Sequence, residues 1–216
     1  MPIDLPPTSR QPAIVTIQPG PGPQAPLVRL RRDVKLDHLL VGACQELGPA
    51  TSSACLVDLT TGRMGGFQEE LPLSPASLIK VPLMVEVLKQ VEAGTLRLDT
   101  PCEIIRTNWT ESYEDNLKVG DRRTVGDLVA LMIAKSDNVA TNTLVDLVDR
   151  TRVNRTMAEL GWPDIRLVRK LSGETPVEGY LPPGNTVTAR SLTELLCAIA
   201  EGCLLYTSDA ADDTPC

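Results

Sequence analysis

Two short polar motifs, each at the edge of an apolar segment, place the strongest constraint on how this chain can fold. Ser77 and Lys80 form an S-x-x-K motif at the start of an apolar run that continues to Val91 and stops at Gly94. A helix would put these two side chains on one face, so the Lys80 amine could reach the Ser77 hydroxyl. Burial near the positive helix N-terminus would lower the pKa of this amine and suit it to act as a base. A surface serine beside a lysine with a solvated amine gives the same pattern, so this motif alone leaves both interpretations open.

The second motif, Ser136-Asp137-Asn138, falls between two predicted helices. Thr124 and Asp127 have the spacing of a capping box ahead of the first of these helices. A loop between two packed helices can direct Ser136 and Asn138 into a cleft, whereas Asp137 is expected to bind backbone N–H groups. The tripeptide alone also suits an ordinary helix cap. Together the two motifs supply two hydroxyls, an amine and a carboxamide, which indicates a serine nucleophile activated by lysine.

With these motifs, the chain resembles class A β-lactamases and related penicillin-binding serine hydrolases over about 36–202. Residues 136–144 match the family pattern S-D-N-x-A-x-N-x-L. The resemblance implies an α+β fold of the β-lactamase/transpeptidase type, with an α/β sandwich beside an all-helical domain. It also implies that Ser77 is acylated and that Lys80 takes its proton. By the same resemblance, Ser136 passes a proton to the β-lactam nitrogen and Asn138 holds the substrate amide.

One departure from the family concerns the group that would activate water for deacylation. The family motif E-x-x-L-N is absent from residues 171–180, and the position of its glutamate falls near Ser172. Glu174 and Glu178 are the candidate deacylation bases, and two solvated loop carboxylates are the alternative interpretation. Without a positioned base the acyl-enzyme would be long-lived. A penicillin-binding D,D-peptidase-like protein with slow deacylation is therefore the alternative to a β-lactamase.

A second departure concerns the C-terminal part of the domain. The K-[ST]-G strand, which follows a helix expected here at 188–201, has no counterpart, so we expect the C-terminal strands of the sheet to be missing. Residues 203–216 resemble a translated sequencing adapter, with a real acidic tail as the alternative. We therefore expect an N-terminal fragment of a longer gene. Because a two-stranded sheet is marginal in isolation, we expect this chain to be unstable or inactive.

The expected domain organisation follows from proline content and from the predicted elements. Eight prolines within the first 26 residues indicate a disordered leader, assigned to 1–34. The β-lactamase-like domain is assigned to 35–202, with a sheet part at 35–70 and a helical part at 71–202. The predicted strands are 53–59 and 63–68, and the predicted helices are 36–47, 76–93, 124–134, 139–149, 152–160 and 188–201.

Composition narrows the partners and the chemistry. The net charge of −7 disfavours nucleic acid and anionic membranes as partners. The family resemblance implies a small-molecule β-lactam or peptidoglycan-like substrate, and we expect a monomeric chain. His38 is the only histidine, which argues against a Ser-His-Asp triad and a zinc hydrolase, and no cofactor or metal is implied. No segment has the length of a membrane-spanning helix. The family implies a periplasmic or secreted protein, but no signal peptide is visible, so a cytoplasmic location stays open.

Overall fold

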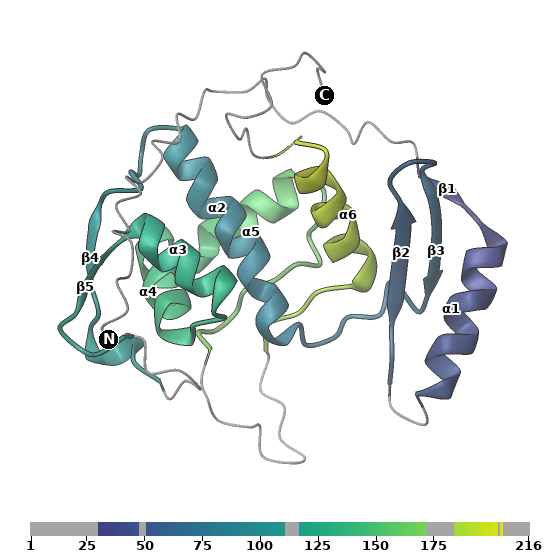
Figure 1. Cartoon of the computed structure of the whole chain (residues 1–216), viewed down its shortest axis with the longest axis horizontal. Coiled ribbons are helices and arrows are strands. Elements are labelled where there is room, and N and C mark those ends of the chain that lie inside the picture. Colours follow the sequence, from purple (N-terminus) through teal and green to yellow (C-terminus); the bar gives the residue numbers. More distant parts are fainter. Residues whose placement is uncertain (1–29, 48–50, 111–116, 172–183, 203, 205–216) are drawn as a thin grey trace, which may run out of the picture.

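A helical body with a small sheet at one end makes up the computed structural model (Figure 1). The structure describes residues 30–47, 51–110, 117–171, 184–202 and 204. The sheet has the strand order β1-β3-β2, from β1 (Arg31–Arg32), β2 (Ala54–Asp58) and β3 (Arg63–Phe67). β3 is the central strand, with β1 parallel to it and β2 antiparallel.

Helix α1 (Val34–Glu46) covers one face of this sheet. Its Asp33 N-cap accepts a hydrogen bond from the Lys35 backbone N–H at 2.8 Å. The helix can approach β3 closely because Gly65 has no side chain. A Cβ atom at Gly65 would lie only 2.4 Å from the Cβ of Leu36. The spacing between α1 and the sheet therefore depends on glycine at this position.

The helical body surrounds α2 (Lys80–Glu92), which follows the short 3₁₀ helix η1 (Ala76–Ile79). The other helices are α3 (Val125–Ala134), α4 (Asn138–Val148), α5 (Arg150–Glu159) and α6 (Ala189–Ala200). The main hydrophobic core lies among these helices, where Leu83, Leu128 and Leu195 have no exposed surface. The core thus fixes α2, whose first residue is Lys80, at the centre of the body.

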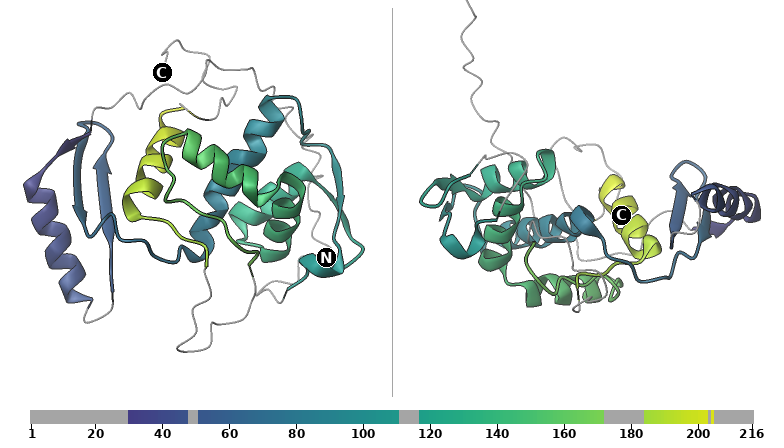
Figure 2. Two further views of the ribbon diagram at one scale, coloured as in Figure 1. Left: turned by 180° about the vertical axis from the view of Figure 1, so that it is seen from behind. Right: turned by 90° about the horizontal axis from the view of Figure 1, so that it is seen from below.

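Helix α6 lies between the other helices and the sheet, as the rear view shows (Figure 2). Its Thr193 hydroxyl donates to the Cys55 backbone oxygen of β2 at 3.4 Å. The Arg190 guanidinium binds Glu194 within the helix and Glu70 beyond β3, at 2.9 and 3.1 Å. These contacts attach the sheet to the helical body.

A two-stranded antiparallel ribbon lies at the opposite end of the body from the sheet. It consists of β4 (Pro101–Glu103) and β5 (Arg122–Thr124), with the 3₁₀ helix η2 (Arg106–Asn108) following β4. None of these three elements was expected from the sequence. Each is only three residues long, so no periodic pattern could distinguish it from a loop.

The predicted helices and the two predicted strands are all present within a few residues of their expected bounds. Two expectations for the N-terminal side are wrong: the bounds of the leader and the number of strands in the sheet. Residues 31–34, assigned to the leader, form β1 and the start of α1, and the sheet has a third strand in consequence. β1 has only two residues, and its pairing with β3 depends on a segment about thirty positions away, which local sequence does not reveal.

The sheet layer is less covered than the helical body. On α1 and β2, the side chains of Val34, Leu39 and Leu56 are 61%, 68% and 45% exposed.

Among the described residues, no helix is both long enough and apolar enough to cross a membrane.

Candidate active site

The first motif lies where η1 meets α2. Ser77 lies within η1, and Lys80 is the first residue of α2, so one helical turn separates them. Pro82 falls in the first turn of α2, where a helix makes no use of the missing N–H. Lys80 is 2% exposed, whereas Ser77 remains accessible. The predicted helical placement of both residues is confirmed, with a tighter 3₁₀ turn at its start.

The two motifs meet at the amine of Lys80. Its Nζ atom lies 2.6 Å from the backbone oxygen of Ser136 and 2.9 Å from the Ser136 hydroxyl. It also lies 2.9 Å from Oδ1 of Asn138 and 3.3 Å from the hydroxyl of Ser77. The two serine hydroxyls are 3.0 Å apart, with Ser136 donating to Ser77. The structure therefore brings together Ser77, Lys80, Ser136 and Asn138.

The number of oxygen neighbours bears on the protonation state of Lys80. A charged amine has three N–H donors, but four oxygen atoms surround this one, so they cannot all accept from it at once. The carbonyl oxygens of Ser136 and Asn138 can only accept hydrogen bonds. A neutral amine can donate to both and keep its lone pair for a serine hydroxyl. The arrangement thus suits a neutral Lys80 that accepts a proton.

Burial also favours the neutral form of Lys80, because it lowers the pKa of the amine. Removal from water penalises the charged amine and lowers its pKa from 10.5 to about 8, while the negative charge of Asp137 acts in the opposite direction. A substantial neutral fraction near neutral pH is what a general base requires. This direction agrees with the lowered pKa expected from the sequence, and desolvation is its main cause.

Ser136 reaches the site through an unusual backbone conformation between α3 and α4. Its φ angle is +54°, in the left-handed region that residues with a Cβ rarely adopt. Asp137, the next residue, caps α4 by accepting a hydrogen bond from the Ala140 N–H at 2.8 Å. Ala76, directly before Ser77, also has a positive φ of +47°. Left-handed residues thus occur in or next to both motifs, as is common where a site requires a fixed geometry.

Asn142 connects the site helix to another segment of the chain. It lies one turn after Asn138 on α4, and its side chain binds both backbone groups of Leu171. The Asn142 Nδ2 donates to the Leu171 carbonyl, and the Leu171 N–H donates to Asn142 Oδ1, each at 2.8 Å. Leu171 itself packs against the hydrophobic core. Glu174 and Glu178, the candidate deacylation bases, lie outside the described residues.

Two further polar side chains, Asn185 and Lys170, stabilise the segment 168–171. Neither was identified from the sequence. The Asn185 carboxamide accepts from the backbone N–H groups of Val168 and Arg169 at 2.7 and 2.9 Å. The Lys170 amine lies 2.5 Å from Asn108 Oδ1 and 2.6 Å from Asp146. The spacing of Asn138, Asn142 and Asp146 on one helix face could have indicated that α4 binds this segment, whereas no sequence signal pointed to Asn185.

Within the ranges that the structure describes, no three His, Cys, Asp or Glu side chains gather in a way that could hold a metal ion. Trp109 is 38% exposed and lies beneath the guanidinium of Arg106, 5.6 Å from the ring centre.

Comparison with known proteins identifies the family. A family model described as the β-lactamase enzyme family matches residues 36–212. The chain belongs to the β-lactamase enzyme family. The matched range includes residues 203–212, part of the segment that the sequence analysis separated from the domain. The mixed α+β, β-lactamase/transpeptidase-like fold expected from sequence is confirmed by this match and by the similar solved structures below.

Three relatives show how far the similarity extends. A β-lactamase from Sphaerobacter thermophilus DSM 20745 is 30% identical with a TM-score of 0.70, over 80% of this chain and 64% of that one. The acyl-enzyme complex of a PBP-A mutant with penicillin G shares the fold at 22% identity and a TM-score of 0.70, over 81% of this chain and 65% of that one. The β-lactamase regulatory protein BlaB of Streptomyces cacaoi is 29% identical over 62% of this chain. The chain spans 44% of BlaB and about two thirds of the two structures.

Proposed function

We propose that the protein is a serine hydrolase of the β-lactamase type that opens β-lactam amides through an acyl-enzyme on Ser77. The observation that carries this proposal is the contact of one buried amine with both serine hydroxyls and with Asn138. Membership of the β-lactamase enzyme family supports the same reaction class. A neutral lysine and two serine hydroxyls within hydrogen-bond distance are sufficient for acyl transfer without a metal or a histidine.

In the acylation step, the Ser77 oxygen attacks the β-lactam carbonyl carbon and loses its proton. Lys80 accepts this proton, either directly across 3.3 Å or through the Ser136 hydroxyl, which lies 3.0 Å from Ser77 and 2.9 Å from the amine. When the C–N bond breaks, Ser136 donates a proton to the leaving nitrogen and is reprotonated by Lys80. The result is an ester on Ser77 and a neutral ring-opened amine.

Asn138 is proposed to bind the substrate. Its Oδ1 atom accepts from Lys80, which fixes the orientation of the amide group. The two N–H donors on Nδ2 then remain for a carbonyl oxygen of the substrate side chain. The same contact would link correct substrate placement to the position of the general base.

A penicillin-binding protein with slow deacylation is the second candidate, and Leu171 favours it. Asn142 fixes the Leu171 backbone one helical turn from Asn138, and the residue at this fixed position has an aliphatic side chain. Leu171 cannot accept a proton from water. Deacylation would then depend on Glu174 or Glu178, or would be slow.

Mass spectrometry of the protein with benzylpenicillin tests both candidates. The 216-residue chain and the protein from the complete reading frame at the source locus are incubated side by side, with Ser77→Ala as the control. A transient adduct on Ser77 supports the β-lactamase, and a persistent adduct supports the penicillin-binding protein. An adduct on the complete-frame protein alone supports the third alternative, in which the 216-residue chain is an inactive fragment. No adduct on either protein contradicts both enzymatic proposals.

A further inference from the structure

A partly exposed polar cluster, centred on Lys170 and including the buried Asn108, lies beside the candidate active site. The Lys170 amine binds Asn108 Oδ1 of η2 at 2.5 Å and Asp146 Oδ2 of α4 at 2.6 Å. Asn108 is 1% exposed, whereas the Lys170 side chain is 31% exposed. The backbone oxygen of Asn108 also accepts from Asn142 Nδ2 at 3.3 Å. Lys170 therefore connects η2, α4 and the segment that ends at Leu171.

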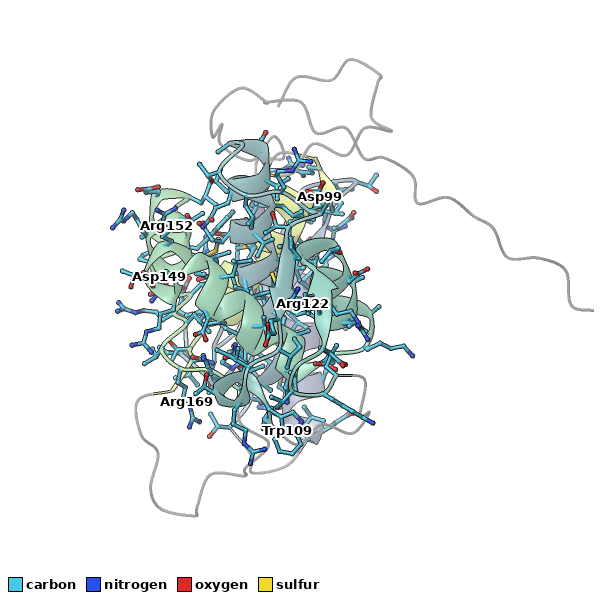
Figure 3. All side chains as sticks on the ribbon, turned by 90° about the vertical axis from the view of Figure 1, so that its left-hand side faces the viewer. Asp99, Trp109, Arg122, Asp149, Arg152 and Arg169 are labelled. Carbon is cyan, nitrogen blue, oxygen red and sulfur yellow. The ribbon has the colours of Figure 1, made fainter. Side chains whose placement is uncertain are left out.

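Helix α4 connects this cluster to the site. Asn138, Asn142 and Asp146 are four residues apart, so their side chains share one face of α4. Along this face, Asn138 binds Lys80, Asn142 binds the Leu171 backbone, and Asp146 binds Lys170. The segment 170–171 is thus aligned along the helix face that begins in the site. Figure 3 shows Trp109 and Arg169, the sequence neighbours of Asn108 and Lys170, at the same end of the molecule.

We propose that Lys170 is a positioning residue for hydrolysis of the acyl-enzyme, an inference that rests on the proposed function of Ser77. By binding Asn108 and Asp146, Lys170 holds the backbone of Leu171 in place one helical turn from Asn138. The groups that form the acyl-enzyme make contacts among themselves, and neither Lys170 nor Leu171 is one of them. An attacking water, in contrast, must be ordered by the surroundings of the ester. Lys170 therefore affects the second half of the reaction more than the first.

The strength of the contacts supports this role. Each is a hydrogen bond from a charged amine, which contributes more than a neutral one. Loss of the amine would also leave the buried Asn108 oxygen without this donor, which adds a desolvation cost. The ion pair with Asp146 is partly exposed and contributes less, so the contact with the buried Asn108 carries most of the expected effect.

The experiment compares Lys170→Ala with wild type, with Arg169→Ala as a matched control on an exposed neighbour. Hydrogen exchange of the Leu171 amide is measured on the 216-residue chain, because this N–H donates to Asn142. The acylation rate and the adduct lifetime with benzylpenicillin are measured on whichever protein forms the Ser77 adduct. Lys170→Arg tests rescue by a residue of the same charge, and Asp146→Asn provides a second variant that keeps side-chain size.

We expect Lys170→Ala to accelerate Leu171 exchange about tenfold, the loss associated with one charged hydrogen bond at a partly exposed site. The adduct lifetime should lengthen by about the same factor, while the acylation rate changes by less than about twofold. Asp146→Asn should act in the same direction, Lys170→Arg should restore part of both effects, and Arg169→Ala should change neither. Unchanged Leu171 exchange, or equal effects on acylation and deacylation, overturns the inference. If wild type forms no adduct, the proposed function fails separately, and Leu171 exchange alone decides whether Lys170 holds this segment.

Discussion

The Nζ atom of Lys80 lies 2.6 Å from the backbone oxygen of Ser136, although 56 residues separate them in the chain. A carbonyl oxygen can only accept, so the amine must use one N–H here. Asn138 takes a second N–H at 2.9 Å. The second motif therefore directs the lysine as well as supplying a hydroxyl, and Lys80 depends on α4 for its orientation.

Replacement of Lys80 should abolish most of the acylation rate. Lys80→Arg keeps the positive charge, but a guanidinium stays protonated and cannot accept the Ser77 proton. General bases contribute about 10²–10⁴-fold, so we expect a loss of about a thousandfold. The rate of adduct formation on Ser77 measures this loss. Lys35→Arg, on exposed α1, should retain the wild-type rate, and a Lys80→Arg protein that acylates normally would rule out Lys80 as the base.

The acylation rate should rise with pH through the pKa of Lys80, which lies at about 8. Below this pH the amine is mostly charged and cannot accept a proton, whereas above it the neutral form predominates. Roughly one tenth of the amine is neutral at pH 7 and nine tenths at pH 9, so the rate should increase about tenfold between these values. Stopped-flow acylation at several pH values measures this profile. A rate that falls or stays constant over the same range would contradict the assignment.

Asp137→Asn should move the rise of the acylation rate with pH to lower pH. The charge of Asp137 raises the pKa of Lys80, so its removal should lower that pKa further. Asparagine caps helices as well as aspartate does, so the start of α4 should persist. The measurement is the pH dependence of acylation for the two proteins at equal ionic strength. If the rise of the acylation rate moves to higher pH instead, Asp137 acts through structure and not through its charge.

Leu171→Glu should shorten the lifetime of the acyl-enzyme. The backbone at this position is fixed by Asn142 one turn from Asn138, so a carboxylate there would occupy a defined place near the site. We expect the adduct to disappear about a hundredfold faster, at the lower end of the range for general-base catalysis. Time-resolved mass spectrometry after penicillin treatment measures this. Arg169→Glu introduces the same group at an exposed position and should have no effect. An equal acceleration by both variants would indicate a general charge effect.

Glu86 should contribute to stability without a role in the reaction. It is 4% exposed between α2 and α5, and accepts from Gln90 Nε2 at 2.7 Å and from the Thr156 hydroxyl. Glu86→Leu leaves both donors without this acceptor, so we expect the free energy of unfolding to fall by about 2 kcal/mol. Glu86→Gln keeps an acceptor and should lose less. Urea unfolding provides the measurement, with the exposed Glu159→Gln as the control expected to stay within about 0.5 kcal/mol of wild type.

Sequence alone predicted the elements that have a periodic apolar pattern and a capping signal. The helix from Val125 follows the Thr124 and Asp127 capping box, and both hydrogen bonds of that box are present in the structure. Short elements were missed, because β1, β4 and β5 have two or three residues and exist through pairing with distant partners. The part that Glu174 and Glu178 play in deacylation stays a prediction.

The sequence by itself determined that Ser77 and Lys80 would lie together. A serine three residues before a lysine at a helix start shares one helix face with it. The sequence also determined that Asp137 would bind backbone N–H groups, since such contacts of aspartate are local. Only the tertiary structure decided that Ser136 and Asn138 meet Lys80, and that Asn142 and Lys170 hold the segment ending at Leu171. The physical reason is range. Helical periodicity and capping depend on neighbours within about four residues, whereas the site is assembled by the packing of α2 against α4 across more than fifty residues.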